Sequence, residues 1–216
     1  MAKSRHHKRQ KRRSAGQRTD ARAFLIREVA HFSLRECCIN ENWKEARLAS
    51  IYFARNRPGG RVAFAGFVVD LGCLGVKGAF ANPAISIPEY ENSLSRGVDR
   101  QIPCDPAFAV KLIQGACDYA QELGFSPDRD YYYAREIFGG IDPASCPDAI
   151  EYGSGGKPSY VAGPYDDVER IMDRLTRKLG PDGFHFVVPL AGQELFDLFD
   201  GEDEPEAWNS GTRVRA

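Results

Sequence analysis

The stretch FVVDLGCLGVKGAF places three residues that can do chemistry in an otherwise apolar, glycine-broken segment: Asp70, Cys73 and Lys77. In a catalytic site, Cys73 would be a nucleophile and Lys77 would lower its pKa. In a structural arrangement, Asp70 would pair with Lys77 or cap a turn, because a buried carboxylate needs a partner. Outside the N-terminal segment only His31 and His185 could serve as a histidine base, so the sequence favours the structural role.

The strongest signal in the chain is the charge of its N-terminal segment, residues 1–19, here called the basic arm. The arm contains eight Lys and Arg and no Asp or Glu, whereas the other 197 residues carry 21 bases and 30 acids. Such a segment can neutralise several phosphates with little sequence preference and a strong dependence on salt. The eight basic residues are Lys3, Arg5, Lys8, Arg9, Lys11, Arg12, Arg13 and Arg18.

The charge pattern predicts a polyanionic partner for the basic arm. Nucleic acid is the leading expectation, with RNA or the ribosome favoured over DNA, and an acidic protein surface is the alternative. The rest of the chain shows no RNP-like aromatic sheet motif, no KH-type loop and no zinc finger. A targeting role is less favoured, because the arm has few apolar residues with which to form an amphipathic face.

Other motifs indicate no cofactor and no metal. The glycine-rich stretch GSGGKPS departs from the phosphate-binding pattern G-x-x-x-x-G-K-[ST] and lies between two β-like runs. The six cysteines form no C-x-x-C pair and are expected to be reduced thiols. Clustered acids fall at expected caps and turns, where Asp is common for conformational reasons. These acids are Asp128, Asp130, Asp142, Asp148, Asp166 and Asp167.

The hydropathy pattern predicts a cytoplasmic protein without a membrane partner. No run approaches the roughly 18 consecutive apolar residues that a spanning helix needs. The N-terminus also lacks the apolar core of a secretory signal.

The elements that must position Asp70 are predicted as a long antiparallel hairpin. ARLASIYFAR and RVAFAGFVVDLG flank an Arg-Pro-Gly-Gly turn, and both faces of the second run are apolar, which is typical of a central strand. CLGVKGAFA is expected to continue as a further strand. Residues 82–104 contain three prolines and are predicted to be a long loop. A helix follows, capped by Asp105, with Pro106 in its first turn, and it ends at Gly124.

The remaining pattern alternates short helices with a second hairpin. Helices are expected from Thr19 or Asp20 to Phe32, around Trp43, before the double glycine at 139–140, and from Asp166 or Asp167 to Lys178. The run AIEYGSGGKPSYVAGP predicts the hairpin, FHFVVPL a strand and GQELFDLF a last helix. The predicted fold class is therefore α+β: one domain over residues 20–199, built on antiparallel β-hairpins packed with helices. It lies between a disordered basic N-terminal arm and an acidic C-terminal tail, residues 200–216.

Three segments, VVDLGCLGVKGAF, YAQELGFSPDRD and GKPSYVAGPYDDVERI, resemble an uncharacterised family of bacterial proteins of unknown function. The resemblance extends over roughly residues 40–180. It implies no activity, ligand or catalytic residue, so the functional expectation rests on the residues themselves.

The sequence leads to one functional hypothesis and two alternatives. The first is a non-enzymatic protein associated with nucleic acid through the basic arm. The second is a hydrolase or nuclease with a site near Asp70, Cys73 and Lys77. The third is a protein-interaction module using the tyrosines at 131–133. The oligomeric state, and whether the two hairpins share one sheet, stay open.

Overall fold

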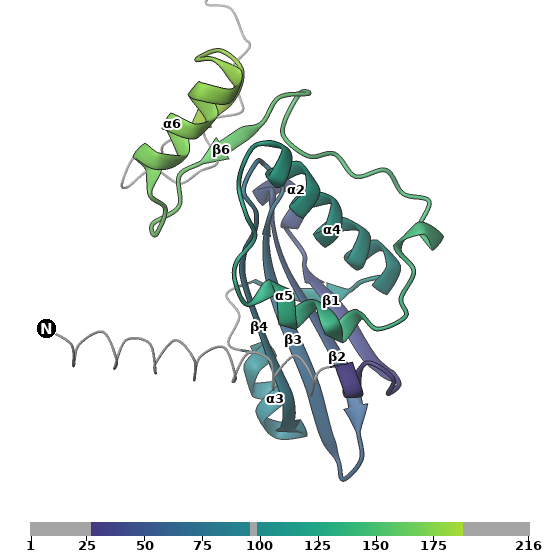
Figure 1. The fold of residues 1–216 in the computed structure, drawn as a ribbon. Coiled ribbons are helices and arrows are strands. Elements are labelled where there is room, and N and C mark those ends of the chain that lie inside the picture. Colours follow the sequence, from purple (N-terminus) through teal and green to yellow (C-terminus); the bar gives the residue numbers. More distant parts are fainter. Residues whose placement is uncertain (1–26, 96–98, 188–216) are drawn as a thin grey trace, which may run out of the picture.

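The computed structural model describes residues 27–95 and 99–187, and it confirms the predicted α+β fold class. One antiparallel sheet has the strand order β4-β3-β2-β1-β5 (Figure 1). Its strands are β1 (Leu34–Asn40), β2 (Leu48–Arg57), β3 (Arg61–Asp70), β4 (Gly75–Ser86) and β5 (Gln101–Pro103). None of the helices in the described ranges is long and apolar enough to cross a membrane.

The predicted hairpin around the Pro-Gly-Gly turn is confirmed as β2 and β3. Gly59 and Gly60 both have positive φ, at 75° and 66°, a backbone conformation that glycine adopts without steric cost. The pairing runs without interruption from Arg57 opposite Arg61 to Leu48 opposite Asp70. As predicted, β3 is a nearly fully buried inner strand, because β2 and β4 flank it and both of its faces are apolar.

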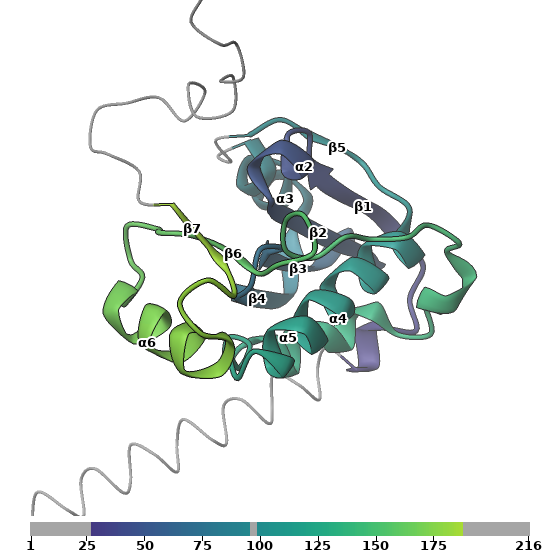
Figure 2. The ribbon, with the colours of Figure 1, turned by 90° about the horizontal axis from the view of Figure 1, so that it is seen from above.

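Helices pack on both faces of the sheet, as Figure 2 shows. One face is covered by α4 (Pro106–Glu122), α5 (Tyr131–Ala134) and the short 3-10 helix η1 (Arg135–Phe138). Asp105 caps α4, as predicted, by accepting a hydrogen bond from the backbone N–H of Phe108. On the other face, α3 (Ile87–Ser95) places Tyr90 against Phe64.

The predicted loop over residues 82–104 is wrong, because this segment holds the end of β4, all of α3 and β5. The three prolines occupy positions that regular structure tolerates. Pro83 lies on β4 and Pro103 on β5, the two edge strands, where an absent N–H leaves fewer ladder bonds unmade. Pro88 lies in the first turn of α3, whose N–H groups have no intrahelical acceptor.

The structure also bears on the helices predicted near the N-terminus. The predicted short helix at Trp43 is confirmed as α2 (Trp43–Ala46). The residues before it form β1, which pairs with β2 on one side and β5 on the other. The first predicted helix lies largely outside the described residues, and within them its last turn ends near Val29.

The predicted second hairpin is wrong. β6 (Ser159–Val161) pairs in parallel with β7 (His185–Val187), and α6 (Val168–Leu179) connects them, so these strands form a separate small sheet. The glycine-rich turn closes only one isolated bridge, between Ser154 and Lys157. The chain before β6 bonds instead to the end of the main sheet. Gly153 N–H donates to the carbonyl of Leu71, and Ser159 N–H donates to the carbonyl of Gly72.

The β6–α6–β7 unit therefore docks on the β3–β4 turn, at one end of the main sheet (Figure 1). A second apolar cluster fills the junction, separate from the main core between the sheet and α4. Its buried members are Cys73, Leu74, Leu123, Tyr160, Leu175 and Phe184. The segment that looked like a site in the sequence is thus the joint between two parts of the fold.

Candidate functional site

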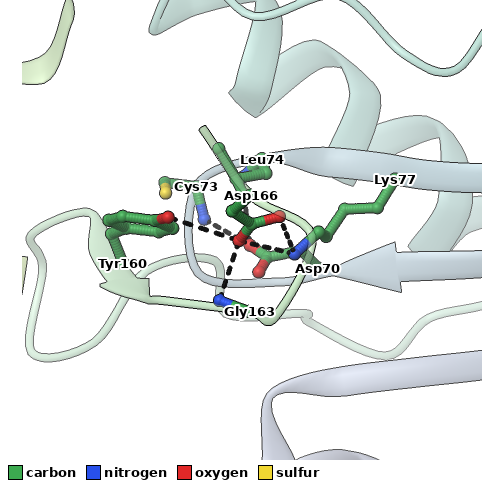
Figure 3. Close-up of polar contacts among 7 residues, drawn as sticks. All are labelled: Asp70, Cys73, Leu74, Lys77, Tyr160, Gly163 and Asp166. Atoms are coloured by element: carbon green, nitrogen blue, oxygen red, sulfur yellow. Dashed lines mark hydrogen bonds and ion pairs between the residues drawn. The ribbon is translucent and has the colours of Figure 1, made fainter. Parts of the chain in front are cut away.

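Asp70 is buried at the end of β3 and caps the β3–β4 turn (Figure 3). Its Oδ1 accepts the backbone N–H of Cys73 at 2.8 Å and of Leu74 at 3.0 Å. Burial raises the pKa of Asp70, and the N–H donors of the turn and the charge of Lys77 oppose this rise. The carboxylate is therefore committed to holding the turn, which is the structural alternative considered from the sequence.

Lys77 forms its ion pair with Asp166 and not with Asp70. Its Nζ lies 2.8 Å from Oδ1 and 2.9 Å from Oδ2 of Asp166, in the loop that precedes α6 (Figure 3). Asp166 Oδ2 also accepts the N–H of Gly163 at 2.9 Å and the hydroxyl of Tyr160 at 3.3 Å. Burial acts to raise the pKa of Asp166, but Lys77 and the N–H of Gly163 lower it below its usual value. This network fastens β4 to the β6–α6–β7 unit.

Cys73 is fully buried in the second apolar cluster. Burial, and then the neighbouring Asp70 carboxylate, raise the pKa of its thiol. A thiol that is buried and protonated is a poor nucleophile, since thiolate is the attacking species. The structure thus brings Asp70, Cys73 and Lys77 together around one turn, in an arrangement whose contacts stabilise the fold.

The clustered acids act mainly as caps, as the sequence indicated. Asp167 accepts from the N–H of Arg170 at the start of α6, and Asp142 accepts from the N–H of Ala144. Asp128 accepts from the N–H of Asp130. Within residues 27–95 and 99–187, no three His, Cys, Asp or Glu side chains are grouped so that they could hold a metal ion.

All eight candidate basic residues of the arm lie outside the described residues. Within them, a basic surface occurs on α6, where four side chains line a hollow of about 290 Å³. The apolar side of α6, including Leu175, packs into the second apolar cluster, so the bases project from the opposite side. This basic α6 face consists of Arg170, Arg174, Arg177 and Lys178.

The basic α6 face was readable from the sequence but was missed. In VERIMDRLTRKL the bases recur three or four residues apart, as the apolar residues do, and spacings of three or four place side chains on one side of a helix. Two of the arginines have neighbours that hold them in place. Arg174 lies over the ring of Phe125 and donates to the carbonyl of Gly124, and Arg177 pairs with Asp173.

The tyrosine run at 131–133 offers one exposed ring. Tyr131 and Tyr133 are buried in the main core, whereas Tyr132 is about half exposed, with the guanidinium of Arg135 5.7 Å from its ring centroid. The three tyrosines therefore do not form a continuous aromatic surface, and the interaction-module alternative retains only Tyr132.

No protein-family model, curated protein or solved structure matches this chain.

Proposed function

We propose that this protein is a non-enzymatic, nucleic-acid-associated protein whose basic arm supplies most of the affinity, with RNA as the preferred partner. The observation that carries the proposal is the separation of charge along the chain. Eight bases and no acids occupy residues 1–19, ahead of a body in which acids outnumber bases by 30 to 21. A polyanion attracts the arm and is repelled by much of the body, so binding through the arm is favoured.

The basic α6 face supports a second contact with the same polyanion. Arg170, Arg177 and Lys178 are exposed on a helix that the second apolar cluster holds firmly in place. Arginine and lysine side chains on one face of a rigid helix suit a phosphate backbone. Asp173 pairs with Arg177 and partly offsets this charge, so the face is expected to add less affinity than the arm.

The non-enzymatic part of the proposal is supported by the partners of the candidate reactive groups. Asp70 caps a turn, Lys77 is in an ion pair, and Cys73 has no exposed surface. Each group is thus already occupied by a contact that stabilises the fold.

Binding of fluorescently labelled single-stranded RNA, followed by anisotropy, tests the proposal. The test variant is the full chain with the eight arm bases changed to glutamine. The control has the same arm residues in scrambled order. We expect the glutamine variant to lose at least about tenfold in affinity and the scrambled arm to bind as the parent does, because phosphate attraction depends on charge and little on order. Equal binding by the parent and the glutamine variant would overturn the proposal.

A further inference from the structure

Within the part of the chain that the structure describes, the sheet face that carries α3 is only partly covered. α3 packs over the end near the β2–β3 turn, where Tyr90 lies 5.3 Å from Phe64 between ring centroids. Beyond that end, three apolar side chains of the same face are exposed: Leu48 at 38%, Val68 at 39% and Phe80 at 43%. We call this part of the sheet, with Tyr52 and Gly66, the open face.

The strand register places an aromatic ring at the middle of the open face. Tyr52 on β2 is opposite Gly66 on β3, and Gly66 is opposite Phe80 on β4, so the three residues form one row across the sheet. A Cβ atom at Gly66 would lie 2.4 Å from the Phe80 ring. The Phe80 ring therefore lies directly on the backbone of Gly66. A side chain at position 66 would clash with the ring and displace it.

Neighbouring rings fix Phe80 in this position. Phe64 meets it edge-on at 5.0 Å between centroids, and Tyr52 lies 6.5 Å away in a tilted arrangement. Because the ring is wedged on its inner sides and exposed on the outer side, it forms a preorganised apolar platform. Planar nucleobases stack on such rings with little regard for their identity.

A pocket of about 580 Å³ adjoins the covered end of the same face. The aromatic contacts run from Phe80 through Phe64 to Tyr90, which lines this pocket. Among residues 27–95 and 99–187, the Tyr90 hydroxyl and the Gln101 Oε1 are buried there without a hydrogen-bond partner. Burial, and then the neighbouring Glu36 carboxylate, raise the pKa of the Tyr90 hydroxyl. Buried polar groups without partners are uncommon in folded proteins, so these two atoms are free to bond to water or to a ligand.

The charges of the pocket fit a neutral polar ligand better than a phosphate. Arg35 lies over the Tyr90 ring and within 3.7 Å of Glu36, and Arg100 pairs with Glu41. Glu91 and Asp99 add further acids to the lining. A nucleobase edge carries both donors and acceptors, so it can satisfy a carboxylate, an amide and a hydroxyl together.

We propose that the open face binds unpaired bases of single-stranded RNA, with one base stacked on Phe80 and the edge of a neighbouring base in the pocket beside Tyr90 and Gln101. This inference rests on the proposed function, in which the basic arm holds the phosphates. The two regions contribute differently to binding. The arm supplies salt-dependent affinity for phosphates, and the open face supplies contacts with nucleobases.

The test uses the full chain with Phe80→Leu, which keeps an apolar side chain and removes the stacking ring. The matched control is Tyr132→Leu, an exposed tyrosine on α5, on the opposite side of the sheet. Each protein is titrated with a labelled single-stranded RNA and with an oligonucleotide of equal length that lacks bases. We expect Phe80→Leu to bind RNA about tenfold more weakly, with unchanged affinity for the abasic strand, because one stacked base contributes on this order. Tyr132→Leu should match the parent on both strands.

A second measurement does not depend on any variant. Ultraviolet irradiation of the parent protein with RNA should cross-link a base to the β4 peptide that contains Phe80, as located by mass spectrometry. Unchanged RNA binding by Phe80→Leu, together with no cross-link to β4, would overturn this inference. If the arm's glutamine variant still loses affinity in that case, the proposed function survives. If Phe80→Leu instead converts a dimer to a monomer in sedimentation without changing RNA affinity, the open face is an interface between two copies and the inference is wrong.

Discussion

The carboxylates of Asp70 and Asp166, on the two sides of the joint between the main sheet and the β6–α6–β7 unit, have pKa values displaced in opposite directions. The pKa of Asp70 is raised above 3.8, chiefly by burial, and the pKa of Asp166 is lowered below 3.8, because Lys77 and nearby donors outweigh burial. For Asp70, folding favours the protonated form, so its contribution to stability is present below the ordinary pKa and is lost as pH rises through the raised value. For Asp166 the contribution is present above the ordinary pKa and is lost as pH falls through the lowered value.

Asp70→Asn keeps an oxygen that can accept the two N–H bonds of the turn and removes the buried charge. We expect the variant to be at least as stable as the parent at neutral pH, with an advantage that shrinks as pH approaches 3.8. Urea denaturation at neutral and acidic pH measures this difference. A variant that is less stable at every pH would mean that the charge strengthens the turn's hydrogen bonds more than burial penalises it.

Asp166→Asn should behave in the opposite way. It breaks the ion pair with Lys77 while leaving an acceptor for Gly163. We expect a loss of about 1.5–3 kcal/mol at neutral pH, the usual range for a hydrogen bond to a charged group. The loss should diminish in acid, where the parent carboxylate is itself protonated. The same denaturation series provides the comparison, and a loss independent of pH would contradict the ion-pair account.

Thiol labelling tests directly whether Cys73 is a buried and unreactive side chain. Cys73 has no exposed surface, whereas Cys104 is only partly buried. We expect a maleimide to label Cys104 in the folded protein and to label Cys73 only when the protein unfolds. Peptide mapping after timed labelling distinguishes them. Fast labelling of Cys73 under native conditions would restore it as a candidate nucleophile.

At the scale of elements, the docking of the β6–α6–β7 unit depends on a close backbone approach at Gly72. A Cβ atom there would lie 2.1 Å from the carbonyl oxygen of Ser159 in β6. We expect Gly72→Ala to destabilise the protein by about 1–3 kcal/mol, since the backbone must shift to relieve the clash. Gly140→Ala is the control, because its Cβ would meet no atom within 4 Å. Equal midpoints in chemical denaturation for the two variants would show that the joint is looser than described.

Elements with strong local signals were predictable from the sequence. The β2–β3 hairpin has a Pro-Gly-Gly turn between β-rich runs, and α4 has Asp105 as its cap and Pro106 in its first turn. The strands that were not predicted correctly depend on contacts between distant parts of the chain. β1 and β5 pair with each other across some sixty residues, and β6 finds its partner only after α6. No local pattern encodes such distant pairing.

The candidate site was predictable in part. Its three residues do gather at one turn, and Asp70 caps it as one of the alternatives stated. The true partner of Lys77 was not foreseen, because Asp166 lies 89 residues away and is brought close only by the docking of the β6–α6–β7 unit. The open face also escaped notice, since the row from Tyr52 to Phe80 exists only once three strands are in register.

At the scale of the whole molecule, the proposed function assigns phosphate binding to the arm and base contacts to the folded body. The body contributes the basic α6 face and the open face, and the arm contributes eight positive charges without acids. If the arm supplies most of the affinity, the dependence of binding on salt must come mainly from residues 1–19. Contacts to bases on the open face change affinity without changing that dependence.

The most direct test is therefore the slope of log affinity against log salt for single-stranded RNA, measured on the parent chain and on the variant with a glutamine-substituted arm. Each phosphate neutralised on a single strand contributes about −0.7 to the slope, so eight arm charges allow a slope of up to about −6. We expect a steep slope for the parent and a much shallower slope for the variant, which keeps the bases of the basic α6 face. The same slope for both proteins would contradict this expectation, because the salt-dependent contact would then lie outside the arm.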